Sequence, residues 1–545
     1  MQTLLKTKDY KHFKVVTTND TIEPENVVFE TCDIDVVSGL FNDDVVELMS
    51  DNTLKLIERN PLKLKNIVGI LNTCSKIKQG IDKKGHMLYL FKPFDCSFPE
   101  FIVASKLNNQ QNNHWVLVDY LDWKDKRPRG AIVHMFGAVG DYAVEKKALI
   151  KHYRPYVSSP KSYIEEVNVI KQKYLNGTWA NGRMIVSDYT VSMDPNGCKD
   201  VDDALSLTKM NDNVYRLGIH ISDVSVWIEP GGILDKNALT LGSTLYHGDD
   251  NLPMWSKELS DDLFSLLEGC DRPTLSVFLE YDISTGVVLN VTNPLKTVVR
   301  NRKQLTYARD SYIEEKNINW EILETIVNAL RRQMSFKIAQ DSHEWIETLM
   351  IYYNIKIAEG FGENGIYRNQ KTRKPDEPED SKIPSKLAFL QWDSANYSLG
   401  SSMHECLGLK KYTHATSPIR RYADYLVQKI INDNAPISQT TLCKLNQSQK
   451  KDKKFYRDLV YLNSIHNNEE QIINAILLED NDKTKFNVFI EEWSCQIKIN
   501  IQCADASVDG GFMTFKRFDC IKLQYYIDPH SIQWKQRIVF QIIKC

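Results

Sequence analysis

Four aspartates lie within ten residues of one another, in the segment 193–205: Asp194, Asp200, Asp202 and Asp203. Carboxylates held close together repel one another, and a fold tolerates that repulsion when a cation lies among them. Hard divalent cations such as Mg²⁺ prefer carboxylate oxygens as ligands. Two such ions, about 4 Å apart, can stabilise both the attacking and the leaving oxygen when a phosphodiester is cleaved. The segment therefore predicts metal-dependent phosphodiester chemistry.

Two other interpretations fit parts of this segment. Asp-Pro-Asn-Gly at 194–197 is a good β-turn sequence, and an acidic loop can simply be solvated. A calcium loop of the EF-hand type needs Gly at its sixth position and Glu at its twelfth, where this chain has Lys199 and Leu205. The calcium interpretation therefore fails. Apolar residues at 184–186 and 204–207 flank the run and predict segments that enter and leave a core, which argues against an exposed loop.

A second group of residues that could take part in binding or catalysis lies in the segment 412–427. Its apolar spacing predicts a helix, with Ser417 as the N-cap and Pro418 in the first turn. Arg420 and Arg421 would then lie in that first turn, where the helix dipole disfavours cations. Arginines in such a place can bind an anion together with the free backbone N–H groups. The alternative is a plain capped helix with two surface arginines.

Together the two segments resemble the two signatures of the ribonuclease II (RNB) family of 3′→5′ exoribonucleases. The form Gly-Cys-Lys-Asp-Val-Asp-Asp-Ala-Leu is most similar to the eukaryotic, exosome-nuclease-like branch. Three further stretches resemble elements of the family in the same order: 217–225, 252–266 and 345–354. The N-terminal endonuclease domain of the exosome subunit is not expected, because a predicted β-module begins almost at the first residue.

This resemblance implies a processive, hydrolytic 3′→5′ exoribonuclease that degrades single-stranded RNA to nucleoside 5′-monophosphates by two-metal catalysis. The expected cofactor is Mg²⁺, with Mn²⁺ as an alternative ion. The resemblance assigns metal coordination chiefly to Asp194, Asp200 and Asp203, and makes Asp202 the residue most sensitive to loss. Arg420 matches the catalytic arginine, which neutralises charge on the reacting phosphate.

Two other functions compete with this prediction. A catalytically weak or inactive RNA-binding scaffold could use the same fold, but the complete set of four aspartates together with Arg420 favours an active enzyme. A metal-dependent phosphodiesterase acting on small nucleotides is disfavoured by the β-rich modules expected on both sides of the catalytic region.

Five residues match or lie near substrate-binding positions of the family: Tyr246, Phe336, Tyr307, Glu347 and Arg421. Tyr246 and Phe336 are candidates to stack on nucleobases, a contact that reads no sequence; the alternative for each is a core aromatic. Tyr307 and Glu347 are candidates for ribose recognition, since a contact to the 2′-OH distinguishes RNA from DNA. Arg421 is either a second phosphate ligand or an ion-pair partner of Asp424, and the second role is slightly favoured.

The chain departs from the family pattern at three places, one of them near Tyr456, where an acidic residue expected in a later helix is replaced. Thr348 stands where the family has a second Glu, and Gln428-Lys429 stands where it has His-Arg. These changes bear on rate, on discrimination between RNA and DNA and on end-product length, but not on the metal site. His220 and Asp223 are expected to support the site from behind.

Composition places the chain among ordinary globular proteins. It has 545 residues, enough for three or four domains, with 42% hydrophobic and 26% charged residues. The net charge of −3 gives no overall signal for nucleic acid, although a channel can still be locally basic. Eleven cysteines are scattered without a Cys-x-x-Cys pair, which predicts reduced thiols.

No apolar run reaches the roughly 20 residues of a membrane span, there is no P-loop, and the N-terminus lacks a secretory signal. We therefore expect a soluble intracellular protein, with the cytoplasm favoured over the nucleus. The expected partner is the 3′ end of single-stranded RNA, without a membrane and without a nucleotide cofactor.

The expected fold is an α+β multidomain chain of four parts. Short strand-like runs with turns between them predict two OB-type, cold-shock-like β-barrels at 1–78 and 79–158. A mixed α/β RNB catalytic domain is expected at 159–478. Strand-like alternation returns at 479–545, where the resemblance implies a divergent OB-type RNA-binding barrel.

Overall fold

The computed structural model describes residues 2–18, 26–31, 37–59, 64–77, 79–107, 111–155, 160–248, 250–362, 365–373, 383–466, 471–482, 485–500, 516–528, 531 and 536–543. The chain divides into two compact units. One unit contains residues 1–155 and 451–545, and the other contains residues 156–450. Each unit is considered by itself.

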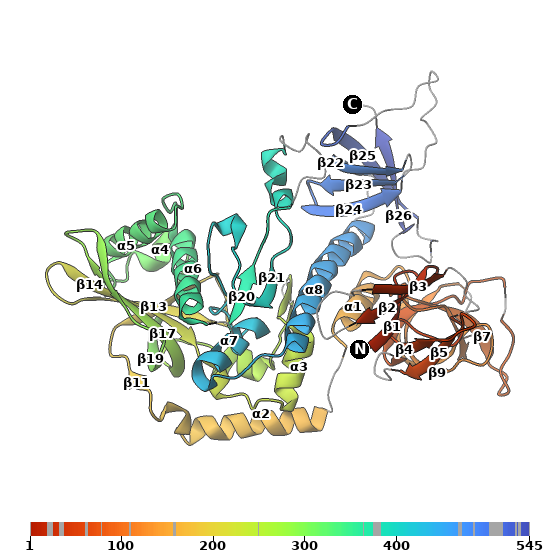
Figure 1. The fold of residues 1–545 in the computed structure, drawn as a ribbon, viewed down its shortest axis with the longest axis horizontal. Coiled ribbons are helices and arrows are strands. Elements are labelled where there is room, and N and C mark those ends of the chain that lie inside the picture. Colours follow the sequence, from red (N-terminus) through yellow and green to blue (C-terminus); the bar gives the residue numbers. More distant parts are fainter. Residues whose placement is uncertain are drawn as a thin grey trace. The chain divides into compact units, whose positions relative to one another are not determined.

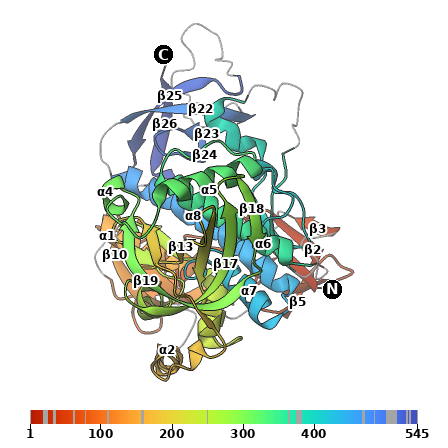
Figure 2. The same ribbon diagram turned by 90° about the vertical axis from the view of Figure 1, so that its left-hand side faces the viewer.

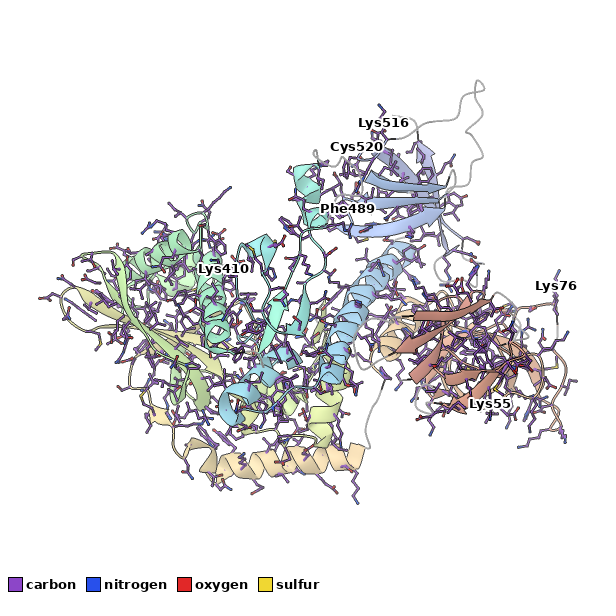
Figure 3. The ribbon with its side chains drawn as sticks, viewed as in Figure 1. Lys55, Lys76, Lys410, Phe489, Lys516 and Cys520 are labelled. Carbon is purple, nitrogen blue, oxygen red and sulfur yellow. The ribbon has the colours of Figure 1, made fainter. Side chains whose placement is uncertain are left out.

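The first module of the chain is an antiparallel sheet in the order β3-β2-β1-β4-β5. Phe13 and Val15 are buried while Lys14 between them is exposed, the alternation expected of a sheet with one face on a core. Lys55 on β5 and Lys76 after β6 are exposed on the N-terminal modules (Figure 3). The strands of this module are β1 (Gln2–Thr7), β2 (Phe13–Thr18), β3 (Asn26–Thr31), β4 (Val45–Leu48) and β5 (Leu54–Glu58).

The second module is a closed barrel in the order β10-β8-β7-β6-β9. Strand β6 pairs with β7 and β9 and all of its residues are buried, so it belongs to this barrel. The predicted boundary at 78/79 was therefore placed too late. The elements are β6 (Ile67–Leu71), β7 (Met87–Pro93), β8 (Phe101–Ser105), β9 (His114–Asp122), β10 (Arg129–Ala138) and helix α1 (Tyr142–Tyr153).

A third β-module follows the long helix α8 (Gln439–His466) and has the antiparallel order β24-β23-β22-β25-β26. Its first strand begins at Gln471, so the predicted boundary at 478/479 falls inside β22. The compact unit that begins at residue 156 ends at residue 450, within α8, whereas the predicted RNB domain runs from 159 to 478; the bounds of that domain stay a prediction. The strands are β22 (Gln471–Asp482), β23 (Lys485–Ile490), β24 (Cys495–Asn500), β25 (Cys520–Ile527) and β26 (Ile538–Ile543).

The unit of residues 156–450 is built on a mixed sheet in the order β11-β19-β12-β13-β14-β17-β18 (Figure 1). Strand β19 also pairs with β17, so β12, β13, β14, β17 and β19 form a closed ring of pairings. The strands are β11 (Met184–Ile185), β12 (Thr190–Asp194), β13 (Asp203–Lys209), β14 (Val214–Ser222), β17 (Asp271–Asp282), β18 (Val287–Val291) and β19 (Leu295–Thr306).

Helices cover this sheet and form its core with it. Helices α5 and α6 lie beside the sheet in both views (Figures 1 and 2), and Tyr353 of α6 donates its hydroxyl to the carbonyl of Leu275 in β17 at 3.1 Å. The helices of the unit are α2 (Pro160–Leu175), α3 (Ile233–Leu241), α4 (Arg309–Tyr312), α5 (Trp320–Gln333), α6 (Ser342–Gly360) and α7 (Tyr422–Asp433).

Two short hairpins and several single turns complete this unit. One hairpin joins β15 (Leu245–His247) to β16 (Asp250–Leu252), and the other joins β20 (Ile366–Asn369) to β21 (Asn396–Leu399). The turns are 3₁₀ helices at Thr178–Ala180, Val224–Val226, Ser385–Gln391 and Glu405–Leu407, and a π-helical turn at Leu259–Leu263. Across the described part of the whole chain, no helix combines the length and the apolar character that a membrane crossing requires.

Candidate active site

The acidic run joins two neighbouring strands of the sheet. β12 ends at Asp194 and β13 begins at Asp203, and the two strands pair antiparallel, Val191 opposite Leu205. Asp194 also lies opposite Thr306 of β19. Strand pairing therefore brings the first and last aspartates of the run to one end of the sheet, although eight residues separate them in the chain.

The loop between these strands is held by side chains from elsewhere in the unit. It begins with a turn in which the amide of Cys198 donates to the carbonyl of Pro195 at 3.1 Å, and Gly197 has φ +80°, a conformation that favours glycine. The hydroxyl of Ser265 donates to the carbonyl of Lys199 at 2.7 Å and accepts from the amide of Val201 at 2.9 Å. This serine therefore fixes the backbone on both sides of Asp200.

Burial makes the negative form of three of these aspartates unfavourable: Asp194, Asp202 and Asp203. Loss of solvent and the nearby charge of Asp202 raise the pKa of Asp194 to about 7. Loss of solvent and the nearby charge of Asp194 raise the pKa of Asp203 to about 7. The Oδ2 atom of Asp194 is buried and has no hydrogen-bond partner among the described residues. The carboxylates of Asp194 and Asp203 would both be stabilised as anions by a cation between them.

These observations are consistent with a divalent cation that binds through few protein side chains. Within the described part of the chain, no three His, Cys, Asp or Glu side chains form a ready-made metal-binding group. Mg²⁺ often binds through only one or two carboxylates, and water and substrate phosphate oxygens complete its octahedron. The pair Asp194 and Asp203 could hold an ion in this way, because Asp202 and Asp200 are each engaged with another side chain.

Asp202 is engaged with the arginine segment. Its Oδ2 accepts from Nε of Arg420 at 2.8 Å, and its Oδ1 accepts from the backbone amide of Ile419 at 2.9 Å. The Asp202 side chain is 2% exposed whereas that of Arg420 is 46% exposed. Burial raises the pKa of Asp202 to about 7, and the charge of Arg420 and the two hydrogen bonds offset only part of this rise. Because the pair is bonded at both oxygens, Asp202 fixes the direction of a guanidinium group that still faces solvent.

The arginine segment does not begin a helix, contrary to the sequence prediction. Residues 418–420 form a turn, and α7 begins at Tyr422, with Arg421 in an extended N-cap conformation (φ −135°, ψ 123°). The amide of Thr244 donates to the carbonyl of Arg420 at 2.9 Å, and that of Tyr422 donates to the carbonyl of Gly242 at 2.9 Å. This pairing extends the chain at Arg421, so neither arginine lies in the first helical turn.

Arg421 forms the ion pair that the sequence analysis slightly favoured. Its Nη2 lies 2.7 Å from Oδ1 of Asp424, and the same oxygen accepts from the amide of Ser417 at 2.8 Å. Asp424 is fully buried. Ser417 therefore does not cap the helix with its hydroxyl; instead, a carboxylate in the first turn of the helix binds the amide of Ser417 and holds the turn in place.

Tyr246 lies beside the acidic run and is 37% exposed. Its hydroxyl donates to Oδ2 of Asp200 at 2.5 Å. Its neighbours Leu245 and His247 are almost fully buried, so the strand β15 is anchored while the ring of Tyr246 faces outward. The position agrees with an aromatic that could meet a nucleobase; the stacking role itself stays a prediction.

Tyr307 follows β19 directly and also lies near the acidic run, since burial and the charges of Asp203 and Asp194 raise its pKa. Glu347 is an exposed residue of α6. Phe336 follows the end of α5, where its amide donates to the carbonyl of Arg331 at 2.8 Å and the guanidinium of Arg331 lies 6.0 Å from its ring. In the described residues, the hydrogen bonds and ring contacts of Phe336 are therefore with Arg331.

Two residues that support the arginine segment were not identified from the sequence. Trp255 donates its indole N–H to the carbonyl of Pro418 at 3.1 Å, and Asn354 accepts from the amide of Ala415 at 2.8 Å. Both hold the segment that carries Arg420. Both lie in stretches that resemble elements of the family, 252–266 and 345–354. This resemblance is the sequence signal that could have identified them.

Two residues that replace family side chains have structural partners. Gln428 donates to the carbonyl of Ser222 at 2.6 Å and accepts from the amide of Val224 at 3.0 Å. The hydroxyl of Thr348 accepts from Nη1 of Arg331 at 2.9 Å. Each departure from the pattern is therefore integrated into the packing of the unit.

His220 and Asp223 lie behind the site, in the interior. His220 is fully buried between the hydroxyls of Ser206, at 3.0 Å, and Ser276, at 2.7 Å. Asp223 is bonded to Nη2 of Arg183 at 2.5 Å. Burial lowers the pKa of His220 to about 3, so this imidazole is neutral at ordinary pH.

Comparison with protein families identifies two parts of the chain. Residues 184–336 and 377–435 match the RNB domain, and residues 88–154 match the Dis3-like cold-shock domain 2. The second match coincides with the closed barrel and α1, and it confirms the predicted OB-type architecture of that module.

Relatives come from both branches of the family. The chain is 25% identical over 460 residues to ribonuclease R of Thermotoga maritima, covering 69% of this chain and 62% of that protein. It is 23% identical over 451 residues to the human exosome complex exonuclease RRP44, covering 67% of this chain and 47% of that protein. The chain thus spans about half to three fifths of the length of these relatives. The predicted assignment to the eukaryotic branch stays a prediction.

Solved structures share the fold. The apo form of Mycoplasma genitalium RNase R superposes with a TM-score of 0.73 at 15% identity, and 100% of both chains is covered. Yeast Ssd1, described as a pseudonuclease, superposes with a TM-score of 0.59 at 15% identity over 92% of this chain and 78% of that one. The acidic run and the arginine segment both lie within the residues that match the RNB domain, so this chain contains an RNB-type domain.

Proposed function

We propose that this chain is a hydrolytic 3′→5′ exoribonuclease acting on single-stranded RNA. The observation that carries the proposal is the bond between Asp202 and Arg420, which holds an exposed guanidinium near Asp194 and Asp203, two carboxylates whose pKa values are raised. An arginine that faces solvent next to a cation site suits a scissile phosphate, which needs positive charge on several of its oxygens.

The chain's own residues have distinct tasks in this reaction. Arg420 binds the phosphate through its Nη atoms, since its Nε is occupied by Asp202. Asp194 and Asp203 would hold Mg²⁺, or Mn²⁺ in its place. A bound ion of this kind neutralises phosphate oxygens and lowers the pKa of an attacking water. Water adds to phosphorus, the bond from phosphorus to the 3′ oxygen breaks, and that oxygen takes a proton. The products are a nucleoside 5′-monophosphate and an RNA shortened by one residue.

RNA is the proposed substrate because of two aromatic side chains beside the acidic run and because of an OB-type module elsewhere in the chain. Tyr246 and Tyr307 are aromatic groups beside the acidic run, suited to a terminal base and its ribose. The closed barrel is an OB-type module, a fold that often binds single strands. The similar fold of Mycoplasma genitalium RNase R has been solved in complex with ribose methylated single-stranded RNA. Two-metal catalysis, processivity and the roles of Phe336 and Glu347 stay predictions.

A catalytically inactive RNA-binding protein is the second candidate, because the fold neighbour Ssd1 is described as a pseudonuclease. The present chain keeps all four aspartates and the arginine, and the structure joins Asp202 to Arg420. The exchanged residues Thr348 and Gln428 have structural partners and leave this pair intact. Activity is therefore the favoured proposal.

The decisive experiment uses a single-stranded RNA labelled at its 5′ end and another labelled at its 3′ end. With Mg²⁺ we expect the 3′ label to be released as a nucleoside 5′-monophosphate while the 5′-labelled strand shortens stepwise. EDTA and the variant Asp194→Asn should each abolish both signals, and a DNA strand of the same sequence should persist. Binding of RNA without any shortening would support the inactive scaffold and contradict the proposal.

A further inference from the structure

Asp200 differs from the other aspartates in its hydrogen-bond partners. It is half-buried, as Asp203 is, whereas Asp194 and Asp202 are buried. Its Oδ2 accepts from the hydroxyl of Tyr246 at 2.5 Å, and its Oδ1 lies 3.7 Å from the thiol of Cys198. Both of its oxygens are thus already in contact with donors. A hydrogen bond from a phenol to an ionised carboxylate is charge-assisted and is stronger than one between two neutral groups.

The two partners of this bond are carried by separate, well-anchored pieces of backbone. Ser265 binds the backbone on both sides of Asp200, so the carboxylate is held from behind. Tyr246 lies on β15, and the strand is preceded by Thr244, whose amide donates to the carbonyl of Arg420. The bond therefore links the acidic loop to the strand that is attached to the arginine segment.

A ring on the outward face of a strand has considerable freedom unless its far end is bound. The Tyr246 ring is 37% exposed, and its hydroxyl is the end farthest from the backbone. Fixing that end to Asp200 sets the direction of the ring face. An aromatic face that is already oriented binds a base with less loss of conformational entropy than a ring that must first be ordered.

We propose that Asp200 is a positioning residue for Tyr246: it orients the ring for the terminal nucleotide by accepting the hydroxyl hydrogen bond, and it does not hold the catalytic metal. This inference rests on the proposed function, because it assigns the ring to the 3′-terminal nucleotide of RNA. It separates Asp200 from Asp194 and Asp203, to which the metal is assigned, and it revises the prediction that all three are metal ligands.

Substitutions at Asp200 can distinguish a hydrogen-bond acceptor from a metal ligand. Asp200→Asn removes the negative charge but keeps a carbonyl oxygen that can accept from the hydroxyl. Asp200→Ala removes the acceptor as well. If Asp200 positions Tyr246, the asparagine variant should resemble the wild type and the alanine variant should resemble Tyr246→Phe. If Asp200 holds a metal through its charge, asparagine and alanine should be equally damaging.

Three measurements are made on each full-length variant. The first is the dissociation constant of a short RNA with a free 3′ end, the second is the length of the final undegraded product, and the third is Mn²⁺ affinity without RNA, by calorimetry. For Asp200→Ala and Tyr246→Phe we expect RNA binding to weaken about three- to tenfold, with altered product length. Asp200→Asn should stay within about threefold of wild type, since a neutral acceptor is weaker than a carboxylate. All three variants should keep Mn²⁺ affinity, and Asp194→Asn should lose it.

Tyr189→Phe is the matched control, because its hydroxyl also donates to a carboxylate, that of Glu315, at 3.1 Å. It should change none of the three measurements. The double variant Asp200→Ala/Tyr246→Phe should bind RNA no more weakly than either single variant, because the two residues act through one bond.

Three results would overturn the inference: loss of Mn²⁺ affinity in Asp200→Asn comparable to that in Asp194→Asn, additive losses in the double variant, or unchanged RNA binding in Asp200→Ala. Hydrolysis by the wild type is measured separately. A wild type that binds RNA without cleaving it would end the proposed function, while the comparison of binding constants would still decide the role of Asp200.

Discussion

Arg420 shows how a single residue gains its role from its partner. Its Nε is bonded to Asp202, and the side chain as a whole is 46% exposed. Asp202 is also bonded to the amide of Ile419, which ties the guanidinium to the backbone that carries it. The Asp202 carboxylate therefore fixes the position of the Arg420 guanidinium by direct contact.

We predict that Arg420→Lys damages turnover nearly as much as Arg420→Ala, with kcat reduced by about 10²–10³-fold in both. An ammonium group can pair with Asp202 or with phosphate, but it lacks the planar fork that does both at once. Single-turnover cleavage of a labelled RNA at saturating Mg²⁺ measures the effect. Recovery of most of the wild-type rate in the lysine variant would mean that Arg420 supplies only diffuse positive charge.

The raised pKa values of Asp194 and Asp203 predict an unusual dependence of stability on pH. In the unfolded chain each carboxyl titrates near 3.8, whereas in the folded chain the pKa of each is about 7. Between these values the folded state holds protons that the unfolded state has released. The contribution of this pair to stability therefore falls as pH rises from about 4 to 7 and is constant at higher pH.

We expect Asp194→Asn to become progressively more stable relative to wild type as pH rises from 5 to 8 in EDTA. Urea unfolding midpoints at several pH values test this. Adding Mg²⁺ at pH 8 should stabilise the wild type and leave the variant unchanged, because binding to the folded state shifts the unfolding equilibrium. A difference between the two proteins that does not depend on pH would contradict the assignment of raised pKa values to this pair.

At the scale of elements, the acidic loop depends on a side chain from the π-helical region that follows β16. Ser265 supplies one donor and one acceptor to the loop backbone, and its neighbour Leu266 packs with Val201 and Ala204 in a small core beneath the loop. The loop is therefore held by both hydrogen bonds and apolar packing. Its geometry is a property of two separate segments of the chain.

We predict that Ser265→Ala raises the Mg²⁺ concentration needed for half-maximal activity several-fold while kcat at saturating Mg²⁺ falls much less. Loss of the hydroxyl leaves a buried amide and carbonyl without their partner, at a cost of about 1–3 kcal/mol. Metal titrations of RNA cleavage separate the two parameters. Ser284→Ala, which removes an exposed hydroxyl bonded to Asp282, is the control. An equal fall in kcat with unchanged Mg²⁺ dependence would show that Ser265 does not order the carboxylates.

At the scale of the whole molecule, distant parts of the chain meet around one buried carboxylate in the unit of residues 1–155 and 451–545. Glu145 of α1 lies 2.5 Å from Nη1 of Arg537, which is 392 residues away in sequence. It also accepts from the indole N–H of Trp115 at 3.1 Å and is bonded to His466 at 2.9 Å. Strand β9, α1, α8 and the C-terminal module are joined by this cluster.

We predict that Glu145→Gln lowers the free energy of unfolding of this unit by about 3–5 kcal/mol, because Arg537 loses its buried counter-charge. Thermal unfolding followed by tryptophan fluorescence measures the loss. Glu100→Gln, at an exposed ion pair with Arg127, should change stability by at most about 1 kcal/mol. Similar effects of the two substitutions would contradict a special role for the cluster.

The same cluster has a defined pH dependence. Its hydrogen bonds and the charge of Arg537 hold the pKa of Glu145 at about 2, below the ordinary value of 4.5. Its contribution to stability is therefore present above pH 4.5 and is lost as pH falls toward 2.

The sequence by itself determined the chemical groups of this protein and the order of its parts. The spacing of the four aspartates, the Ser-Pro-Ile-Arg-Arg segment and the alternating apolar strands were sufficient to predict an RNB-type α+β chain flanked by β-modules. These features are local, because they depend on residue type and on the short-range periodicity of strands and helices. Family and fold class were predicted from them and are confirmed.

Only the tertiary structure decided which of these groups meet. Asp202 and Arg420 are 218 residues apart, and Asp200 and Tyr246 are 46 residues apart, so no local pattern specifies either bond. The N-cap of α7 is Arg421 and not Ser417 for the same reason: pairing with residues 242–244 extends the chain at Arg421 and overrides the local capping signal. The boundary between the first two β-modules differs from the predicted one because strand β6 belongs with its pairing partners, and not with the strands nearest to it along the chain.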